Sequence, residues 1–336
     1  MVDFLIEVGL FAAKATTLVL AIIATVAAIL GMASRGRMRD KGHLSIKKLN
    51  QRFASMKESL QRAVLSKKEA KRAAKAALQA TNRHQDKPRK RLYVVDFDGD
   101  LRASAVTALR EEVTAILTVA TPQDEVVVRL ESGGGLVHAY GLAASQLVRL
   151  RSSSIPLTVI VDKVAASGGY LMACVANRLI AAPFALVGSI GVVMQLPNFH
   201  RWLQKNDVDL ELLTAGEHKR TLTLFGENTE EGRHKAQEDI DTAHDLFKRF
   251  IAEHRPQVRL DEVATGEHWF GRRALALNLV DSLGTSDDYL LSCSADNDIY
   301  QVTFKPRTPL AKKLAELTDE AASKLLRIGV RHATPS

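Results

Sequence analysis

The residues best suited to chemistry lie in the stretch VDKVAASGGYLMACVANRLI, residues Val161–Ile180. Ser167 stands there among alanines and glycines, where a strand-like apolar run ends and a helical run begins. A helix start supplies unpaired backbone N–H groups and a positive dipole end, which suit a developing oxyanion. The glycines at 133–135 end another strand-like run and can offer further N–H groups without a Cβ in the way. These features outline acyl transfer, although the local pattern by itself favours a tight packing site in which the hydroxyl bonds to its own backbone.

A serine hydroxyl becomes a strong nucleophile only when a base removes its proton. The G-x-S-x-G motif of many hydrolases is absent, and none of the histidines stands in a recognisable triad context. A lysine can act as the base when an apolar site lowers its pKa, but composition does not choose among the lysines. The 2 cysteines, Cys174 and Cys293, imply no disulfide framework and lack metal-ligand spacing. Acyl transfer by a serine and a base needs no metal or cofactor, and we expect none.

The elements that must hold these residues follow from the hydrophobic pattern between residues 91 and 194. Apolar, β-branched runs begin near residues 91, 125 and 156, and each leads through a glycine-marked turn into a stretch with helical spacing. Alternating strands and helices of this length predict an α/β domain with a largely parallel, buried sheet. The apolar run 179–194 is 16 residues long and contains a proline and two glycines. We interpret it as buried strands rather than a membrane helix.

The N-terminal region predicts a membrane anchor. Residues 15–33, ATTLVLAIIATVAAILGMA, are 19 uncharged residues, enough to cross a bilayer as a helix. A cleaved signal peptide is disfavoured, because acids rather than a basic cluster precede a long apolar run. From Arg35 to Arg91 the chain carries 19 Lys and Arg against 4 acids, and the remainder from Leu92 is net −6. The positive-inside rule therefore favours a cytoplasmic C-terminal side.

The basic segment after the anchor predicts a helical stalk. An apolar seam recurs there at steps of three and four residues, formed by Ile46, Leu49, Phe53, Met56, Leu60 and Ala63. A short coiled coil, a helix lying on its own domain and a helix lying on the lipid surface all remain open. Nucleic acid is not an expected partner, since the segment lacks interleaved aromatic residues and any zinc or helix-turn-helix signature.

Four stretches carry a family resemblance: KVAASGGYLMACVAN, LVGSIGVVMQLPNF, TAGEHKRTLT and ATGEHWFGRRALALNLVDSLGT. Together they resemble the signal peptide peptidase A family of serine peptidases, in particular its membrane-anchored members. The similarity runs from the N-terminal span to at least Thr285. With the hydrophobic pattern it divides the chain into a transmembrane anchor at 1–34, a basic helical stalk and linker at 35–90, a serine peptidase domain at 91–300 and an amphipathic helical tail at 301–336.

The resemblance implies a Ser-Lys dyad. By position, Ser167 matches the family's nucleophile, and Lys219, which follows 52 residues later, matches the general base. The N–H groups of Gly135 and Gly168 match the donors of the oxyanion hole. Lys163 is nearer in sequence, but an extended strand would place it roughly 13 Å from the serine, so we interpret it as structural.

Two positions depart from the family pattern. The family's S-P-G-G loop reads Ser132-Gly133-Gly134-Gly135 here, and glycine loosens a position that proline would stiffen. Asn278 replaces a glycine that is common before Leu-Val-Asp. Asparagine tolerates the left-handed backbone conformation, so the turn is expected to survive.

The resemblance also implies a fold, an assembly and a location. The fold is similar to Clp protease and crotonase, with repeated strand-strand-helix units, and single-domain members form rings whose active sites lie at subunit contacts. We therefore expect a single-pass homo-oligomer of the bacterial inner membrane that cleaves peptides or membrane-derived protein segments. The family's peptidase domains face the periplasm, against the charge pattern, so the side stays open. The alternative functions are a catalytically silent membrane scaffold and a crotonase-type acyl-CoA enzyme.

Overall fold

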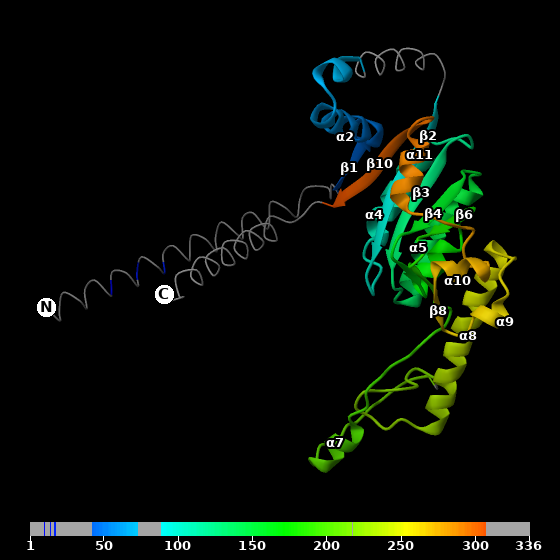
Figure 1. Cartoon of the computed structure of the whole chain (residues 1–336). Coiled ribbons are helices and arrows are strands. Elements are labelled where there is room, and N and C mark those ends of the chain that lie inside the picture. The colour runs from blue at the N-terminus through cyan, green and yellow to red at the C-terminus, as the bar shows by residue number, and fades with distance from the viewer. Residues whose placement is uncertain are drawn as a thin grey trace, which may run out of the picture. The chain divides into compact units, whose positions relative to one another are not determined.

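The computed structural model describes residues 42–72, 89–216 and 218–306, together with positions 10, 14 and 17 (Figure 1). Most of the predicted anchor, most of the predicted linker and the predicted tail beyond residue 306 lie outside the described residues. In the described ranges no helix is long and apolar enough to cross a bilayer. All of the candidate site residues belong to one structural unit, Leu44–Phe304.

Strands and helices alternate along most of this unit. The first half contains β1 (Gly42–Lys48), α2 (Leu49–Val64), β2 (Lys90–Gly99), α4 (Val106–Leu117), β3 (Glu125–Ser132), α5 (Val137–Ser152), β4 (Leu157–Val161), β5 (Val164–Ala166) and α6 (Gly168–Ala173). The second half contains β6 (Arg178–Ala181), β7 (Leu186–Gly188), α7 (His200–Lys205), α8 (Glu230–His254), α9 (Leu260–Val263), β8 (His268–Phe270), α10 (Gly271–Ala276), β9 (Ser282–Leu283), α11 (Ser286–Cys293) and β10 (Asn297–Pro306). The α/β class predicted from the sequence is confirmed.

The strands form one sheet with helices on both faces. Its main order is β1-β10-β2-β3-β4-β6-β9, and the pairs from β10 to β9 are parallel. Every residue of β4 is buried, as expected for a strand that is covered on both sides. One face packs against α4, α5 and α6, which contribute Val113, Leu147 and Tyr170 to the core. The other face packs against α2 and α11 through Leu49 and Leu290.

Strand β3 changes its partner along its length, and this change positions the candidate site. Residues 126–129 pair with β4, whereas Ser132 pairs with Ala165 in β5. Strand β5 in turn pairs with β7, which pairs antiparallel with β8. The residues that follow β3 and those that follow β5 therefore leave the sheet at neighbouring strand ends.

Several local predictions can be compared with this architecture. The apolar run 179–194 contributes to β6 and β7 rather than to a membrane helix, as predicted. Asn278 has φ 59°, the left-handed conformation expected at its turn. The predicted stalk helix is wrong at Ile46, which lies in β1 beside β10. The predicted helical tail is wrong at residues 301–306, which form the end of β10. A strand at a sheet edge is stabilised by backbone hydrogen bonds to its neighbour. Apolar residues spaced three and four positions apart do not show whether such a neighbour exists, so the spacing alone predicted a helix.

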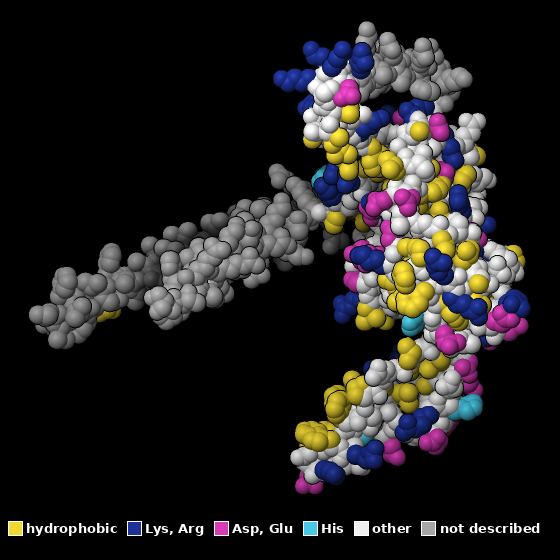
Figure 2. Space-filling model, viewed as in Figure 1, with side chains coloured by type: hydrophobic (Ala, Val, Ile, Leu, Met, Phe, Trp, Pro, Cys, Tyr) yellow, Lys and Arg dark blue, Asp and Glu magenta, His cyan; other side chains and the backbone are white. Residues whose placement is uncertain are grey.

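Between β7 and the middle of α8 the chain leaves the sheet as an arm, residues 191–240, which includes α7 (Figure 1). The arm exposes large apolar side chains, among them Val193, Trp202, Leu213 and Phe225. Figure 2 shows hydrophobic side chains gathered along it. Because burial of apolar surface is favourable, an exposed set of this kind is typical of a protein interface.

Candidate active site

Ser167 forms the sharp turn between β5 and α6. Its backbone angles are φ 52° and ψ −118°, a conformation that L-residues rarely adopt. The Ser167 amide donates to the Gly188 carbonyl at 2.8 Å, and the Ser167 carbonyl accepts from the Leu171 amide at 2.9 Å. Hydrogen bonds on both sides therefore hold the strained turn. A serine on a strained strand-to-helix turn has the geometry of a nucleophile elbow, here without the G-x-S-x-G motif.

The surroundings of the Ser167 side chain leave its hydroxyl available for chemistry. The residue is half-buried, and its hydroxyl has no hydrogen-bond partner among the described residues. Gly168 follows as the first residue of α6 and is buried. The first N–H groups of a helix have no acceptor within the helix. The Gly168 N–H is thus suited to an oxyanion, which is the role predicted for it.

The glycine loop at residues 133–135 lies directly against this turn. A Cβ on Gly134 would lie 2.7 Å from both the Gly168 nitrogen and the Ser167 Cβ, and Gly134 has φ 89°. Glycine satisfies both the contact and the backbone angle. A Cβ on Gly135 would instead overlap the carbonyl of Leu101. The structure therefore brings Gly134, Gly168 and Ser167 together, while the α-carbon of Gly135 faces Leu101.

Two buried hydroxyls behind the loop hold it in place. The Tyr140 hydroxyl donates to the Asp100 carbonyl at 2.7 Å and lies 2.5 Å from the Ser132 hydroxyl. The Ser132 oxygen in turn accepts from the Gly134 amide at 3.1 Å. Burial raises the pKa of Tyr140, so its hydroxyl stays protonated and can donate. A Cβ on Gly168 would overlap the Tyr140 ring, so Tyr140 supports the loop and the turn at once.

Sequence reasoning did not identify Gly134, Ser132 or Tyr140 as site residues. The glycine triplet signalled a loop but not which glycine meets the serine. The hydrogen bond from Tyr140 to Asp100 joins residues 40 positions apart. A local pattern of apolar spacing contains no information on such a contact.

The two candidate lysines lie in different surroundings. Lys219 is exposed in the arm, and its amide donates to the Gly216 carbonyl at 3.1 Å. In the described part of the chain, no contact joins Lys219 to Ser167. The Lys163 ammonium lies 2.9 Å from a carboxylate oxygen of Glu131. This hydrogen bond raises the pKa of Lys163, which opposes a role as a neutral base and agrees with the structural interpretation.

The other reactive groups of the described residues do not form a second centre. Burial raises the thiol pKa of both Cys174 and Cys293, so neither is poised as a thiolate nucleophile. Within the described ranges, no group of three or more His, Cys, Asp or Glu side chains is placed to hold a metal ion. The Ser167 turn therefore stays the candidate nucleophilic site among the described residues.

Comparison with known proteins places the whole of this site inside matched regions. The model of the peptidase family S49 N-terminal region matches residues 3–147, and that of peptidase family S49 matches residues 149–299. A Haemophilus influenzae protein described as probable protease SohB is 45% identical over 338 residues, which cover 96% of each chain. A protein with the same description from Buchnera aphidicola subsp. Schlechtendalia chinensis is 47% identical over 304 residues, 86% of this chain and 99% of the relative. Another, from Buchnera aphidicola subsp. Acyrthosiphon pisum, is 52% identical over 241 residues, 71% of this chain and 72% of the relative.

Proposed function

Because this chain belongs to peptidase family S49 and is a protease, we propose that it cleaves peptide bonds with a dyad of Ser167 and Lys219. The family resemblance of its sequence motifs is confirmed by these matches. The observation that carries the dyad proposal is the strained Ser167 turn, packed against Gly134 and the start of α6. Such a conformation costs on the order of 1–3 kcal/mol, and strain of this size clusters at functional sites. Similarity of the α/β sheet to the Clp protease and crotonase fold is part of this proposal.

In the proposed reaction, a neutral Lys219 accepts the proton of the Ser167 hydroxyl while the serine oxygen attacks the carbonyl carbon of a peptide bond. The N–H groups of Gly135 and Gly168 stabilise the oxyanion of the tetrahedral intermediate. Collapse of the intermediate breaks the C–N bond, and the lysine gives its proton to the leaving amine. The same lysine then deprotonates a water molecule, which hydrolyses the acyl-enzyme and restores the serine hydroxyl.

The position of Lys219 supports a dyad completed between two copies of the chain. Lys219 lies on the arm, which extends from the sheet that carries Ser167 (Figure 1). The exposed apolar residues of the arm, such as Trp202 and Leu213, would be buried if the arm packed against a second copy. A homo-oligomer in which one copy supplies the serine and its neighbour the lysine accounts for both features. A head-to-tail contact of this kind gives a ring when its rotation closes, and the proposal is for such a ring.

Membrane anchoring by residues 15–33 is a second part of the proposal. It rests on the 19 uncharged residues of that segment and on the basic residues that follow it. An anchor would hold the peptidase beside the bilayer of the bacterial inner membrane, where extended peptides and membrane-derived protein segments are the substrates we expect. The charge pattern favours the cytoplasmic side, and the family resemblance favours the periplasm. A reporter that is active in one compartment only, fused to the C-terminus, distinguishes the two.

Peptide hydrolysis by the purified full chain tests the dyad. We expect Ser167→Ala and Lys219→Ala each to lower kcat by at least about 10³-fold, with Lys163→Ala as a matched control that keeps its activity. A serine-reactive probe should label Ser167 in the wild type but not in Lys219→Ala, which a crotonase-type acyl-CoA enzyme does not predict. Hydrolysis that is unchanged in both variants would falsify the dyad. A wild type without hydrolytic activity would instead indicate the scaffold function.

Mixing the two inactive variants tests whether the dyad forms between copies. In randomly mixed oligomers, about a quarter of the sites combine an intact serine from one chain with an intact lysine from the other. We therefore expect about a quarter of the wild-type rate after subunit exchange. If the mixture stays inactive although the subunits demonstrably exchange, both residues come from one chain.

A further inference from the structure

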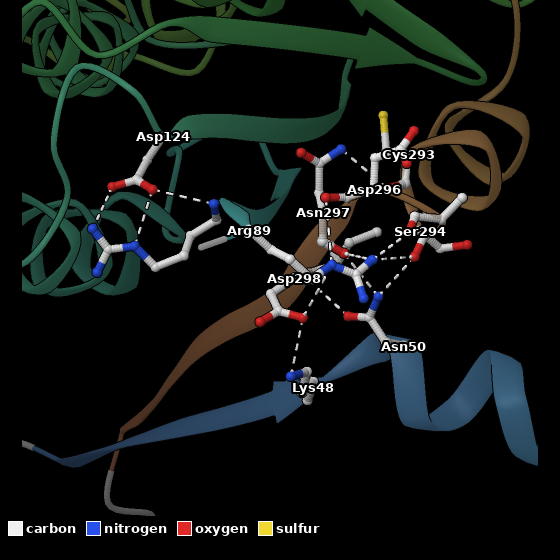
Figure 3. A network of polar contacts seen from close by, with 12 residues as sticks. Lys48, Asn50, Arg89, Asp124, Cys293, Ser294, Asp296, Asn297 and Asp298 are labelled. Carbon is white, nitrogen blue, oxygen red and sulfur yellow. Dashed lines mark hydrogen bonds and ion pairs between the residues drawn. The ribbon is translucent and has the colours of Figure 1, made fainter. Parts of the chain in front are cut away.

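Among the described residues, the contacts that fix helix α2 to the domain lie at the start of the helix. Leu49 is 5% exposed and packs against the sheet, with Phe53 partly buried beside it. The Asn50 side chain donates to the carbonyls of Ser294 and Asn297 at 3.1 and 2.9 Å. These bonds, drawn in Figure 3 with the Lys48–Asp298 ion pair, clamp the first turn of α2 to the loop between α11 and β10.

The rest of α2 carries its apolar stripe away from this clamp. Met56, Leu60 and Val64 continue the spacing that begins with Leu49 and Phe53, so they lie on the same side of the helix. Their exposed fractions are 58%, 66% and 72%. In the part of the chain that the structure describes, the stripe thus passes from buried to exposed within one helix. Figure 2 shows apolar side chains in the region of α2.

Basic side chains border the exposed stripe. At 100° per residue, Arg52 falls on one side of the stripe and Lys57 on the other. Neither makes an ion pair with a described residue. The acid Glu58 lies on the opposite side of the helix and is paired with Arg62. Residues 49–72 contain seven Lys or Arg against two Glu, a net charge of +5.

We propose that α2 is an interfacial helix whose exposed stripe docks on the surface of an anionic phospholipid bilayer. In this arrangement Met56, Leu60 and Val64 enter the boundary between headgroups and acyl chains, while Arg52 and Lys57 contact lipid phosphates. A nucleic acid would pair with the basic side chains Arg52 and Lys57 but leave the apolar stripe in water. A coiled coil with a second copy would bury the stripe, but the exposed part covers fewer than three heptads. The basic side chains on either side of the stripe would also face those of the second copy and repel them.

This helix would set the orientation of the peptidase relative to the membrane. Because the clamp of Figure 3 joins the first turn of α2 to the sheet, the lipid contact of its later turns is transmitted to the domain. The proposal depends neither on the Ser-Lys dyad nor on which side of the membrane the domain lies, since α2 makes the contact through its own side chains.

Spin labels on the full chain test this contact. Cys293→Ser removes the partly exposed thiol, and Cys174 is buried, so a cysteine introduced in this background is labelled selectively. Leu60→Cys reports on the stripe, and Ser55→Cys, exposed on another side of the same helix, is the matched control. Each labelled chain is reconstituted into vesicles of phosphatidylcholine alone or mixed with phosphatidylglycerol. Collision rates with oxygen and with a water-soluble nickel chelate report lipid and water exposure.

We expect the oxygen-to-nickel ratio of the Leu60 label to rise at least about two-fold when phosphatidylglycerol is present, and that of the Ser55 label to stay unchanged. Charge reversal in Arg52→Glu/Lys57→Glu should abolish the rise while peptide hydrolysis in detergent remains at the wild-type rate. The proposal is overturned if the Leu60 label is as exposed to water as Ser55 in anionic vesicles. It is equally overturned if that label is shielded to the same extent in vesicles of phosphatidylcholine alone, which indicates a second copy, or only after nucleic acid is added.

Discussion

The backbone of Ser167 is strained at the residue that carries the proposed nucleophilic hydroxyl. Its φ of 52° is fixed by hydrogen bonds to Gly188 and Leu171, and the strained residue lies at the strand end where the glycine loop arrives. A stability optimum would place glycine at such a position. The retention of serine there is consistent with a nucleophile rather than a packing residue.

Two substitutions of Ser167 separate strain from chemistry. Both Ser167→Gly and Ser167→Ala remove the hydroxyl and are expected to abolish hydrolysis. Only glycine relieves the strain, so Ser167→Gly should be more stable than Ser167→Ala by about 1 kcal/mol in urea denaturation. Equal stabilities of the two variants would show that the turn is not strained.

The adjacent glycines provide a matched pair for testing the loop. Gly134→Ala places a Cβ against Ser167 and Gly168 at a φ of 89°, whereas a Cβ on Gly133 has no atom within 4 Å. Because this Cβ would displace the Gly168 N–H that is proposed to bind the oxyanion, we expect Gly134→Ala to lower kcat/KM by about 100-fold or more and Gly133→Ala to change it by less than about two-fold. Similar kinetics for the two variants would mean that contact between the loop and the turn is unimportant for catalysis.

At the scale of elements, the end of β10 is joined to α4 by a buried carboxyl group. Glu112 is 3% exposed and accepts a hydrogen bond from the Phe304 amide at 2.7 Å. Burial raises the pKa of Glu112 to about 7, although the Phe304 hydrogen bond lowers it. The folded protein therefore keeps this proton at pH values where the unfolded chain, with a pKa of 4.5, has released it.

This carboxyl predicts a pH-dependent stability. Its contribution is fully present below about pH 4.5 and is lost as the pH rises through about 7, since ionisation is unfavourable in the folded state. Glu112→Gln keeps an acceptor for Phe304 without the charge. We expect it to exceed the wild type by about 2–3 kcal/mol at pH 8 and to differ little at pH 4.5, measured as urea midpoints. If Glu112→Gln and the wild type differ in stability by the same amount at both pH values, the pKa of Glu112 is not raised in the folded protein.

At the scale of the whole molecule, the arm separates the two proposed members of the dyad. The Ser167 turn is built by β3, β5, β7 and α6, whereas Lys219 lies among exposed residues of the arm. Solvent-exposed apolar residues such as Leu213, at 92% exposure, have no role in the core of this chain. In the proposed homo-oligomer, association of the arm with a second copy would make activity depend on assembly.

Leu213→Glu tests that link. A charge at this position should weaken the oligomer and abolish hydrolysis without unfolding the chain, because the side chain makes little contact within its own chain. Leu291 is 60% exposed on α11, so Leu291→Glu is the matched control. This variant should keep both the oligomer and the hydrolytic activity. Light scattering after gel filtration measures the assembly, and circular dichroism checks the fold. A fully active Leu213→Glu variant with wild-type mass would separate the arm from catalysis.

The sequence by itself determined the alternation of strands and helices, the place of Ser167 between a strand and a helix, and the left-handed turn at Asn278. These features depend on residues close together along the chain, where hydrophobic spacing and backbone preference act directly. Family resemblance added the lysine, which no local pattern selects.

Only the tertiary structure decided that β1 joins the sheet at β10, that Gly134 rather than Gly135 meets the serine turn, and that Tyr140 supports both. It also placed Lys219 on an arm and left the second half of α2 exposed. These outcomes arise from strand register and from contacts between residues far apart in the chain. Backbone hydrogen bonds across strands are formed by the same groups in every residue, so the sequence around one strand does not name its partner.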